Sequence, residues 1–89
     1  MNLDRNAIQT AIKAKVIELA DQLGSDAADL SVDELIPASG TIDSAGLLEL
    51  VAWFESCYQF RVPDSDFTID NLGSIAQMTD YLLRIKKAR

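Results

Sequence analysis

The 89-residue sequence has no histidine and only one cysteine, Cys57. Histidine is the commonest general base and the commonest metal ligand, so its absence argues against most catalytic and many metal sites. A single cysteine excludes an internal disulfide framework and the paired-cysteine zinc patterns. An active nucleophile also needs a nearby base and a group that orients it, and no such set stands out. We therefore expect a protein that is not an enzyme and has no metal site.

Long apolar runs are also missing. None approaches the ~18 residues that a membrane span requires, and the first residues, MNLDRNAIQT, lack the apolar centre of a signal peptide. The length suits one small domain over residues 1–89. We expect a monomeric cytoplasmic protein without membrane contact.

Basic residues are scarce in the middle of the chain. From Val16 to Asp80 there are 13 acids and a single base, Arg61. Such a segment repels phosphate backbones, which argues against nucleic acid as a partner. Its field would steer basic protein surfaces toward it, although a solvated acidic face explains the composition equally well. Both interpretations stay open.

Apolar spacing predicts three main helices. Segment 4–23 repeats apolar residues at intervals of three and four, with Asp4 as N-cap and Gly24 as stop. A second helix is expected over 44–58 and a third from about Ser74, with a short turn around Phe67 after the helix-breaking Pro63. The expected inner faces are Ile8, Ile12, Val16, Leu19 and Leu23; Leu47, Leu50, Val51, Phe54, Cys57 and Tyr58; and Ile75, Met78, Leu82 and Ile85.

The connection between the first two helices is long. Ser31 and Glu34 fit a capping box, but Pro37 leaves room for one helical turn at most. Spaced apolar residues predict a loop packed onto the bundle: Leu30, Leu35, Ile36 and Ile42. No strand alternation is present. The sequence predicts a small all-α bundle with a long first loop.

The aspartates of residues 64–70 and the single cysteine have simple structural interpretations. Asp64, Asp66, Thr68 and Asp70 alternate like the start of a calcium loop, but isoleucines stand where that loop needs glycine and glutamate. Turn or cap roles are therefore favoured for these aspartates. Cys57 falls in the core stripe, so we expect a small buried hydrophobe.

The outward side of the second helix is unusually apolar. Either a neighbouring loop covers it, or it is a docking surface rimmed by charge. Docking is favoured for Leu48, and both interpretations stay open for Trp53. The outward face comprises Ala45, Leu48, Glu49, Ala52, Trp53 and Ser56, and all of these except Ser56 are the expected partner surface.

Asp43 and Ser44, within TIDSAGLLEL, precede this helix. A helix N-terminus presents unpaired N–H groups and partial positive charge, so a phosphodiester on Ser44 would be stabilised there. Capping is what such residues commonly do, and from the residues alone a cap is the favoured interpretation.

Residues 42–64, IDSAGLLELVAWFESCYQFRVPD, resemble the acyl carrier and peptidyl carrier protein family. An Asp-Ser pair, a Leu/Val-rich helix with an early glutamate, an aromatic residue and a Val-Pro turn occur in register. DNLGSIAQMTDYL also resembles the approach to that family's last helix. The resemblance implies a four-helix carrier bundle of three main helices and one short one.

The resemblance further implies a 4′-phosphopantetheine arm on Ser44, next to Asp43. Its thiol, not Cys57, would hold an acyl or aminoacyl group as a thioester. The implied partners are a phosphopantetheinyl transferase, an acyl- or aminoacyl-loading ligase, and downstream synthases or transferases. Asp43 and the acidic second helix would meet basic patches on these enzymes. We expect the partner surface to comprise Ala45, Leu48, Glu49, Ala52 and Trp53.

Ala45 and Gly46 depart from the leucine and acid that this family most often has after the serine. The pattern looks more like free-standing carriers of specialised pathways than the carrier of fatty acid biosynthesis. An acyl carrier and an aminoacyl or peptidyl carrier both remain open, because the loading enzyme selects the cargo. A helical adaptor that binds a partner helix without a covalent group is the alternative from another class.

Overall fold

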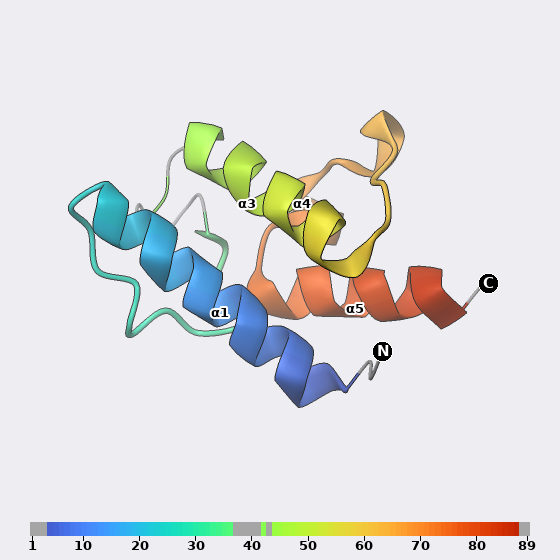
Figure 1. Ribbon diagram of the computed structural model, residues 1–89, viewed down its shortest axis with the longest axis horizontal. Helices are drawn as coiled ribbons and strands as arrows, with labels where there is room; N and C mark the ends of the chain where they lie inside the picture. The colour runs from blue at the N-terminus through green and yellow to red at the C-terminus, as the bar shows by residue number, and fades with distance from the viewer. Residues whose placement is uncertain (1–3, 37–41, 43, 88–89) are drawn as a thin grey trace.

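The computed structural model describes residues 4–36, 42 and 44–87, and all of its regular elements are helices. In chain order they are α1 (Arg5–Gln22), α3 (Ser44–Tyr58), the 3₁₀ turn η1 (Asp64–Asp66), α4 (Ile69–Leu72) and α5 (Ile75–Lys87). Helix α1 packs against both α3 and α5, and the short α4 packs against α5 (Figure 1). Over the described residues there are no strands. The prediction of an all-α bundle is confirmed. None of the described helices is long and apolar enough to cross a membrane.

Helix α1 ends as the sequence predicts, but its start differs from the prediction in the role of Asp4. Gly24 has φ +76, a left-handed conformation that glycine adopts without steric cost, and the helix stops there. Asp4 occupies the N-cap position, and its carbonyl accepts the Ile8 N–H at 2.9 Å. Its side chain makes no cap hydrogen bond. Asp4 therefore marks the start of α1 without capping it.

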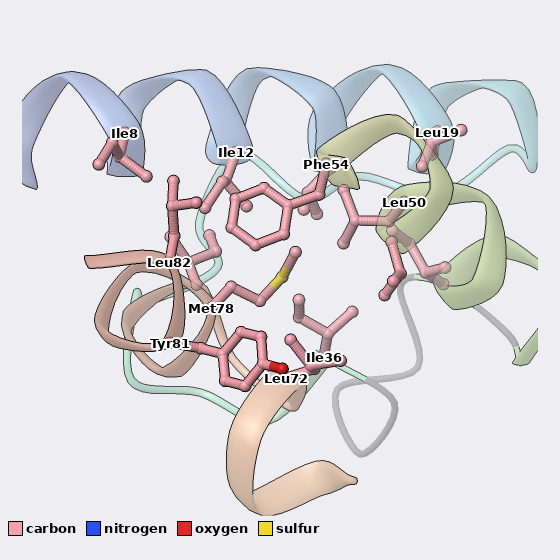
Figure 2. Close-up of a cluster of buried hydrophobic side chains, with 14 of the residues drawn as sticks. Ile8, Ile12, Leu19, Ile36, Leu50, Phe54, Leu72, Met78, Tyr81 and Leu82 are labelled. Carbon is pink, nitrogen blue, oxygen red and sulfur yellow. The ribbon is translucent and has the colours of Figure 1, made fainter. Parts of the chain in front are cut away.

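The core lies where the three long helices meet. Phe54 of α3 and Met78 and Leu82 of α5 are fully buried, and Figure 2 shows them between α1 and the C-terminal helices. Phe54 makes edge contacts with the rings of Tyr58 and Phe60, with centroids 5.4 Å and 5.2 Å apart. This filled centre holds α3 at a fixed position against α1 and α5.

The first loop packs onto the bundle, as its apolar residues predict. Leu30, Ile36 and Ile42 are buried. The Ile36 N–H donates to the Gly73 carbonyl at 2.7 Å, and the Ala76 N–H donates to the Val32 carbonyl at 2.8 Å. These bonds tie the loop to the junction of α4 and α5. Near Ser31, the Glu34 carboxylate accepts the Ser31 N–H at 3.5 Å in a turn.

Three predictions of burial are wrong. Cys57 is exposed, because it lies at the edge of the apolar sector in the last turn of α3, where no described element covers it. Leu23 follows α1 as its C-cap and is 51% exposed. Leu35 is 39% exposed, although its neighbour Ile36 is buried. Leu47 and Ile85, also expected inside, are half-buried against the core.

The C-terminal third has local caps of its own. Ser74 is buried, and its hydroxyl accepts the Gln77 N–H at 3.1 Å, which caps α5. The Thr68 hydroxyl accepts the Asn71 N–H at 3.3 Å at the start of α4. Each of these hydroxyls thus caps the helix that follows it.

Candidate functional site

Ser44 is the first residue of α3. The side chain of Ser44 and the whole of Asp43 lie outside the described residues, so their predicted roles stay predictions. The start of a 15-residue helix carries partial positive charge from its aligned peptide dipoles. No acidic residue lies in the first turn of α3. A negative group attached there would therefore meet no competing carboxylate from that turn.

The side chains after Ser44 leave this end of α3 open. Ala45 and Glu49 are exposed, and Gly46 is half-exposed. Leu48 is 58% exposed, the most exposed large apolar residue that the structure describes. Ala52, one turn further, is also exposed. These side chains form one surface beside the candidate attachment point.

Trp53 behaves differently from the rest of the predicted partner surface. It is half-buried and packs against the core. Its ring stacks on Phe54 with the centroids 6.5 Å apart. Part of the Trp53 side chain is thus covered from within the fold. A partner role for this surface stays a prediction for all five residues.

A groove lies beside Ser44 on the side of α1. It has a volume of about 290 Å³ and lies between the last turn of α1 and the first turns of α3. Both helix ends are on the same side of the molecule (Figure 1). The lining residues are Leu19, Gln22, Leu23, Ala45, Gly46 and Glu49. The α1 residues of this groove were missed at the sequence level, because a helical wheel of α3 does not reveal which helix lies beside it.

A smaller cavity lies on the α4 side of α3. Its volume is about 90 Å³, and it is lined by Leu47, Phe67, Thr68, Leu72 and Gly73. Leu47 is three residues after Ser44, so this cavity also opens near the start of α3. The groove thus lies between α3 and α1, and the smaller cavity lies between α3 and the segment around α4.

The charge near this site is not neutralised by the ion pairs that the structure describes. Those pairs join Arg5 to Asp80 and Lys15 to Glu18, each at 2.6 Å. Neither involves Glu49, which stays exposed beside the groove. A cation brought by another molecule could therefore pair with Glu49.

Asp66, one of the acids considered for a calcium loop, has a structural partner. Its carboxylate accepts a hydrogen bond from the Tyr81 hydroxyl at 2.8 Å. Burial of Tyr81, with this hydrogen bond as the next cause, raises the pKa of Tyr81 from 10.0 to about 12. Within residues 4–36, 42 and 44–87, no three potential ligand side chains come together to hold a metal ion.

Comparison with known families shows which family the chain belongs to. The model of a family described as "Phosphopantetheine attachment site" matches residues 16–82, well over half of the chain. The chain belongs to this family. Members of the phosphopantetheine-attachment family carry 4′-phosphopantetheine covalently, and the start of α3, without acids in its first turn, fits the phosphate of that group.

Individual relatives agree with the family match. The chain is 31% identical over 77 residues to the D-alanyl carrier protein of Streptococcus thermophilus, which covers 86% of this chain and 98% of the relative. It is 30% identical to the D-alanyl carrier proteins of Streptococcus gordonii, over 77 residues, and Streptococcus pyogenes serotype M1, over 78 residues. These matches cover 86% and 88% of this chain and 98% and 99% of the relatives. No solved structure gives a significant match.

Family membership makes the protein a phosphopantetheine-bearing carrier, which confirms the resemblance and its implied cofactor. Carriers of this family are generally not catalytic themselves and act with transferases and ligases. The adaptor without a covalent group is not favoured by these matches. Fatty acid biosynthesis gains no specific support from relatives that are named for D-alanine.

Proposed function

We propose that Ser44 bears the 4′-phosphopantetheine arm and that the protein is a free-standing carrier of a small aminoacyl group. The observation that supports this cargo most directly is the set of D-alanyl carrier relatives, which align over nearly their whole length. The cargo would be held as a thioester on the thiol of the arm. A short acyl group is the second candidate, because the cavity beside Leu47 is lined largely by apolar side chains.

The choice of Ser44 is supported by its place at the start of α3. In the transfer from coenzyme A, a bond forms between the serine oxygen and phosphorus, and the adenosine bisphosphate portion leaves. The hydroxyl proton passes to a base of the transferase, since this chain contains no histidine. The phosphodiester that results keeps its negative charge at the positive end of the α3 dipole.

A small cargo is supported by the filled core. Phe54, Met78 and Leu82 have no exposed surface, and they occupy the space between the long helices. The cavity of about 90 Å³ beside Leu47 holds about three groups of the size of water, at ~30 Å³ each. An alanyl group is of that size. A long acyl chain would stay in water or would have to displace core side chains.

The partner surface is supported by exposure and charge. Leu48 offers an exposed apolar side chain, and Glu49 offers a carboxylate beside it. We propose that the transferase and the loading ligase contact these two residues with an apolar side chain and a basic one. Electrostatic attraction of this kind raises association rates more than final affinity.

Intact mass tests the attachment. Incubation with coenzyme A and a broad-specificity phosphopantetheinyl transferase should add one phosphopantetheine to the wild type and none to Ser44→Ala. Ser56→Ala is the matched control, because Ser56 is an exposed serine on the same helix. It should gain the same mass as the wild type. A gain in Ser44→Ala, or none in a folded wild type, would leave Ser44 as a helix cap only.

The cargo is tested on the modified protein. With ATP, D-alanine and an adenylating ligase that activates D-alanine, the mass should rise by one alanyl group, and hydroxylamine should remove it as expected for a thioester. The matched reaction uses octanoate with an octanoate-activating ligase. Loading with octanoate but not with D-alanine would contradict the aminoacyl proposal and leave the attachment at Ser44 intact.

A further inference from the structure

A hollow lies at the C-terminal end of α3, the end opposite to Ser44. Its volume is about 550 Å³, and its lining residues are Ala52, Glu55, Ser56, Gln59, Phe60 and Arg61. We propose that this hollow is a second contact point for the loading ligase, which places an acidic side chain in it against Arg61. The inference rests on the proposed carrier function and adds a contact opposite in charge to the one proposed at Glu49.

The hollow is continuous with the partner surface along one face of α3. Residues four apart are neighbours on a helix surface, and one such row consists of Ser44, Leu48, Ala52 and Ser56. Ala52 belongs to both the partner surface and the hollow. From residue 48 to residue 56 a helix rises about 12 Å. A typical interface covers about 800 Å² of each partner, a patch ~28 Å across, so one enzyme can contact both places.

The turn that follows α3 gives the hollow a defined shape. Gln59 has φ +55, a left-handed conformation in which the chain leaves the helix. The Phe60 N–H donates to the Glu55 carbonyl at 3.1 Å, and the Val62 N–H donates to the Glu55 carboxylate at 2.7 Å. Phe60 and Val62 are both buried. Arg61 lies between these two anchored residues, so its backbone is held at the hollow.

Arg61 brings a positive charge into an acidic part of the chain. It is exposed, and it is the only basic residue over residues 16–80. Within the part of the chain that the structure describes, it forms no ion pair. The Lys86 ammonium donates to the Gln59 carbonyl at 3.5 Å and adds a second positive charge at this end of α3. This end therefore attracts an anionic group, whereas Glu49 near the start of α3 attracts a cationic one.

The state of Glu55 favours an acidic occupant over a basic one. The Glu55 carboxylate is half-buried and accepts the Val62 N–H, so a hydrogen bond within the fold already compensates part of its charge. The Arg61 guanidinium is more accessible, and a basic side chain would meet its like charge. The Ser56 hydroxyl and the Gln59 amide can donate further hydrogen bonds to an entering carboxylate.

The loading ligase suits this distant contact better than the transferase does. A transferase must bring its active site to the Ser44 oxygen itself. A ligase acts on the thiol at the other end of the arm, so its contacts with the carrier are not confined to the start of α3. Charges of opposite sign at Glu49 and Arg61 would fix the direction in which the ligase lies along α3, because complementary charges set orientation and like charges reject other orientations.

Steady-state kinetics of loading test the proposal. Wild type, Arg61→Gln and Arg61→Glu are modified with coenzyme A and a broad-specificity transferase, and intact mass verifies the modification. The ligase that activates D-alanine is then assayed with excess ATP and D-alanine and with the modified carrier as the varied substrate. Arg61→Gln should raise the KM for the carrier about fivefold, as for an exposed ion pair at the upper end of its range. Arg61→Glu should raise it at least ~10-fold, because like charges then face each other. The kcat should not change.

Arg5→Gln is the matched control for the loss of one positive charge. Arg5 is an exposed arginine of α1 that pairs with Asp80 of α5, and it does not line the hollow. Its KM should equal that of the wild type. Raising the ionic strength should reduce the difference between wild type and Arg61→Gln, since salt screens exposed charges. The transferase should modify every variant at the rate of the wild type.

Several results would overturn the contact while the carrier function stands. One is an unchanged KM in Arg61→Glu, and another is an equal rise in Arg5→Gln. A lower KM in Arg61→Gln would mean that the occupant is basic and faces Glu55. Slower modification of the Arg61 variants by the transferase would overturn the assignment to the ligase. A modified wild type that takes up no D-alanine is a separate result, which overturns the proposed cargo and the ligase contact together.

Discussion

Phe54→Leu tests whether the aromatic cluster at the end of α3 determines the stability of this fold. Phe54 is fully buried, and its ring makes edge contacts with Tyr58, at an interplanar angle of 76°, and with Phe60, at 89°. Leucine keeps an apolar side chain at this position but removes both ring pairs. Each such pair contributes about 0.5–1.5 kcal/mol beyond its burial, so we expect a loss of about 2 kcal/mol from the free energy of unfolding.

Urea denaturation followed by far-ultraviolet circular dichroism measures this loss. A small domain has a urea m-value of about 1–3 kcal/mol/M, so a loss of about 2 kcal/mol lowers the midpoint by about 1 M. The native state should remain dominant, since small domains are stable by about 5–15 kcal/mol. Trp53 fluorescence is less suitable as the main probe, because its ring stacks on Phe54 itself.

Phe67→Leu is the matched control for the same chemical change. Phe67 is 37% exposed, and surface changes of this kind usually cost no more than about 0.5 kcal/mol. The reasoning would be refuted if Phe54→Leu cost less than about 0.5 kcal/mol, or if both variants lost the same stability. In either case the ring contacts around Phe54 would not distinguish it from an exposed phenylalanine.

The other two predictions concern α5. Because the pKa of Tyr81 is raised from 10.0 to about 12, the protonated phenol is favoured in the folded state, so its stabilising effect is complete below pH 10 and is lost as the pH rises toward 12. Tyr81→Phe should show a smaller decline of stability between pH 10 and 12 in urea titrations, and equal declines would contradict this. Ser74→Ala removes the cap on Gln77 and should cost about 1 kcal/mol in the same assay. Ser56→Ala, at an exposed position within a helix, is the control and should cost less than about 0.5 kcal/mol. If the two variants lost the same stability, the cap assigned to Ser74 would be contradicted.

The helices could be predicted from the sequence because two independent local signals agree. Apolar spacing gives the period of each helix, and Gly24 and Pro63 interrupt the pattern where the helices have ended. The errors of burial fall at the ends of elements. Leu23 follows the last residue of α1, and Cys57 lies at the edge of the apolar sector of α3, although the neighbouring Tyr58 is buried. A helical wheel does not show whether another element covers such positions.

The site could be predicted only in part. The position of Ser44 at the start of α3 follows from the local pattern, and the family match agrees with the resemblance of residues 42–64. The groove could not be predicted, since it requires Leu19 and Leu23 to lie beside Ala45. That juxtaposition depends on how α1 crosses α3, which is a property of tertiary packing and leaves no periodic signal in either helix alone.

The position of the groove gives the first loop a role in the site. Backbone hydrogen bonds tie Ile36 to Gly73 and Val32 to Ala76, so residues 32–36 of the first loop are anchored beside α4 and α5. The buried core also holds α3 against α1. The two helix ends that form the groove are thus held by contacts distant from Ser44.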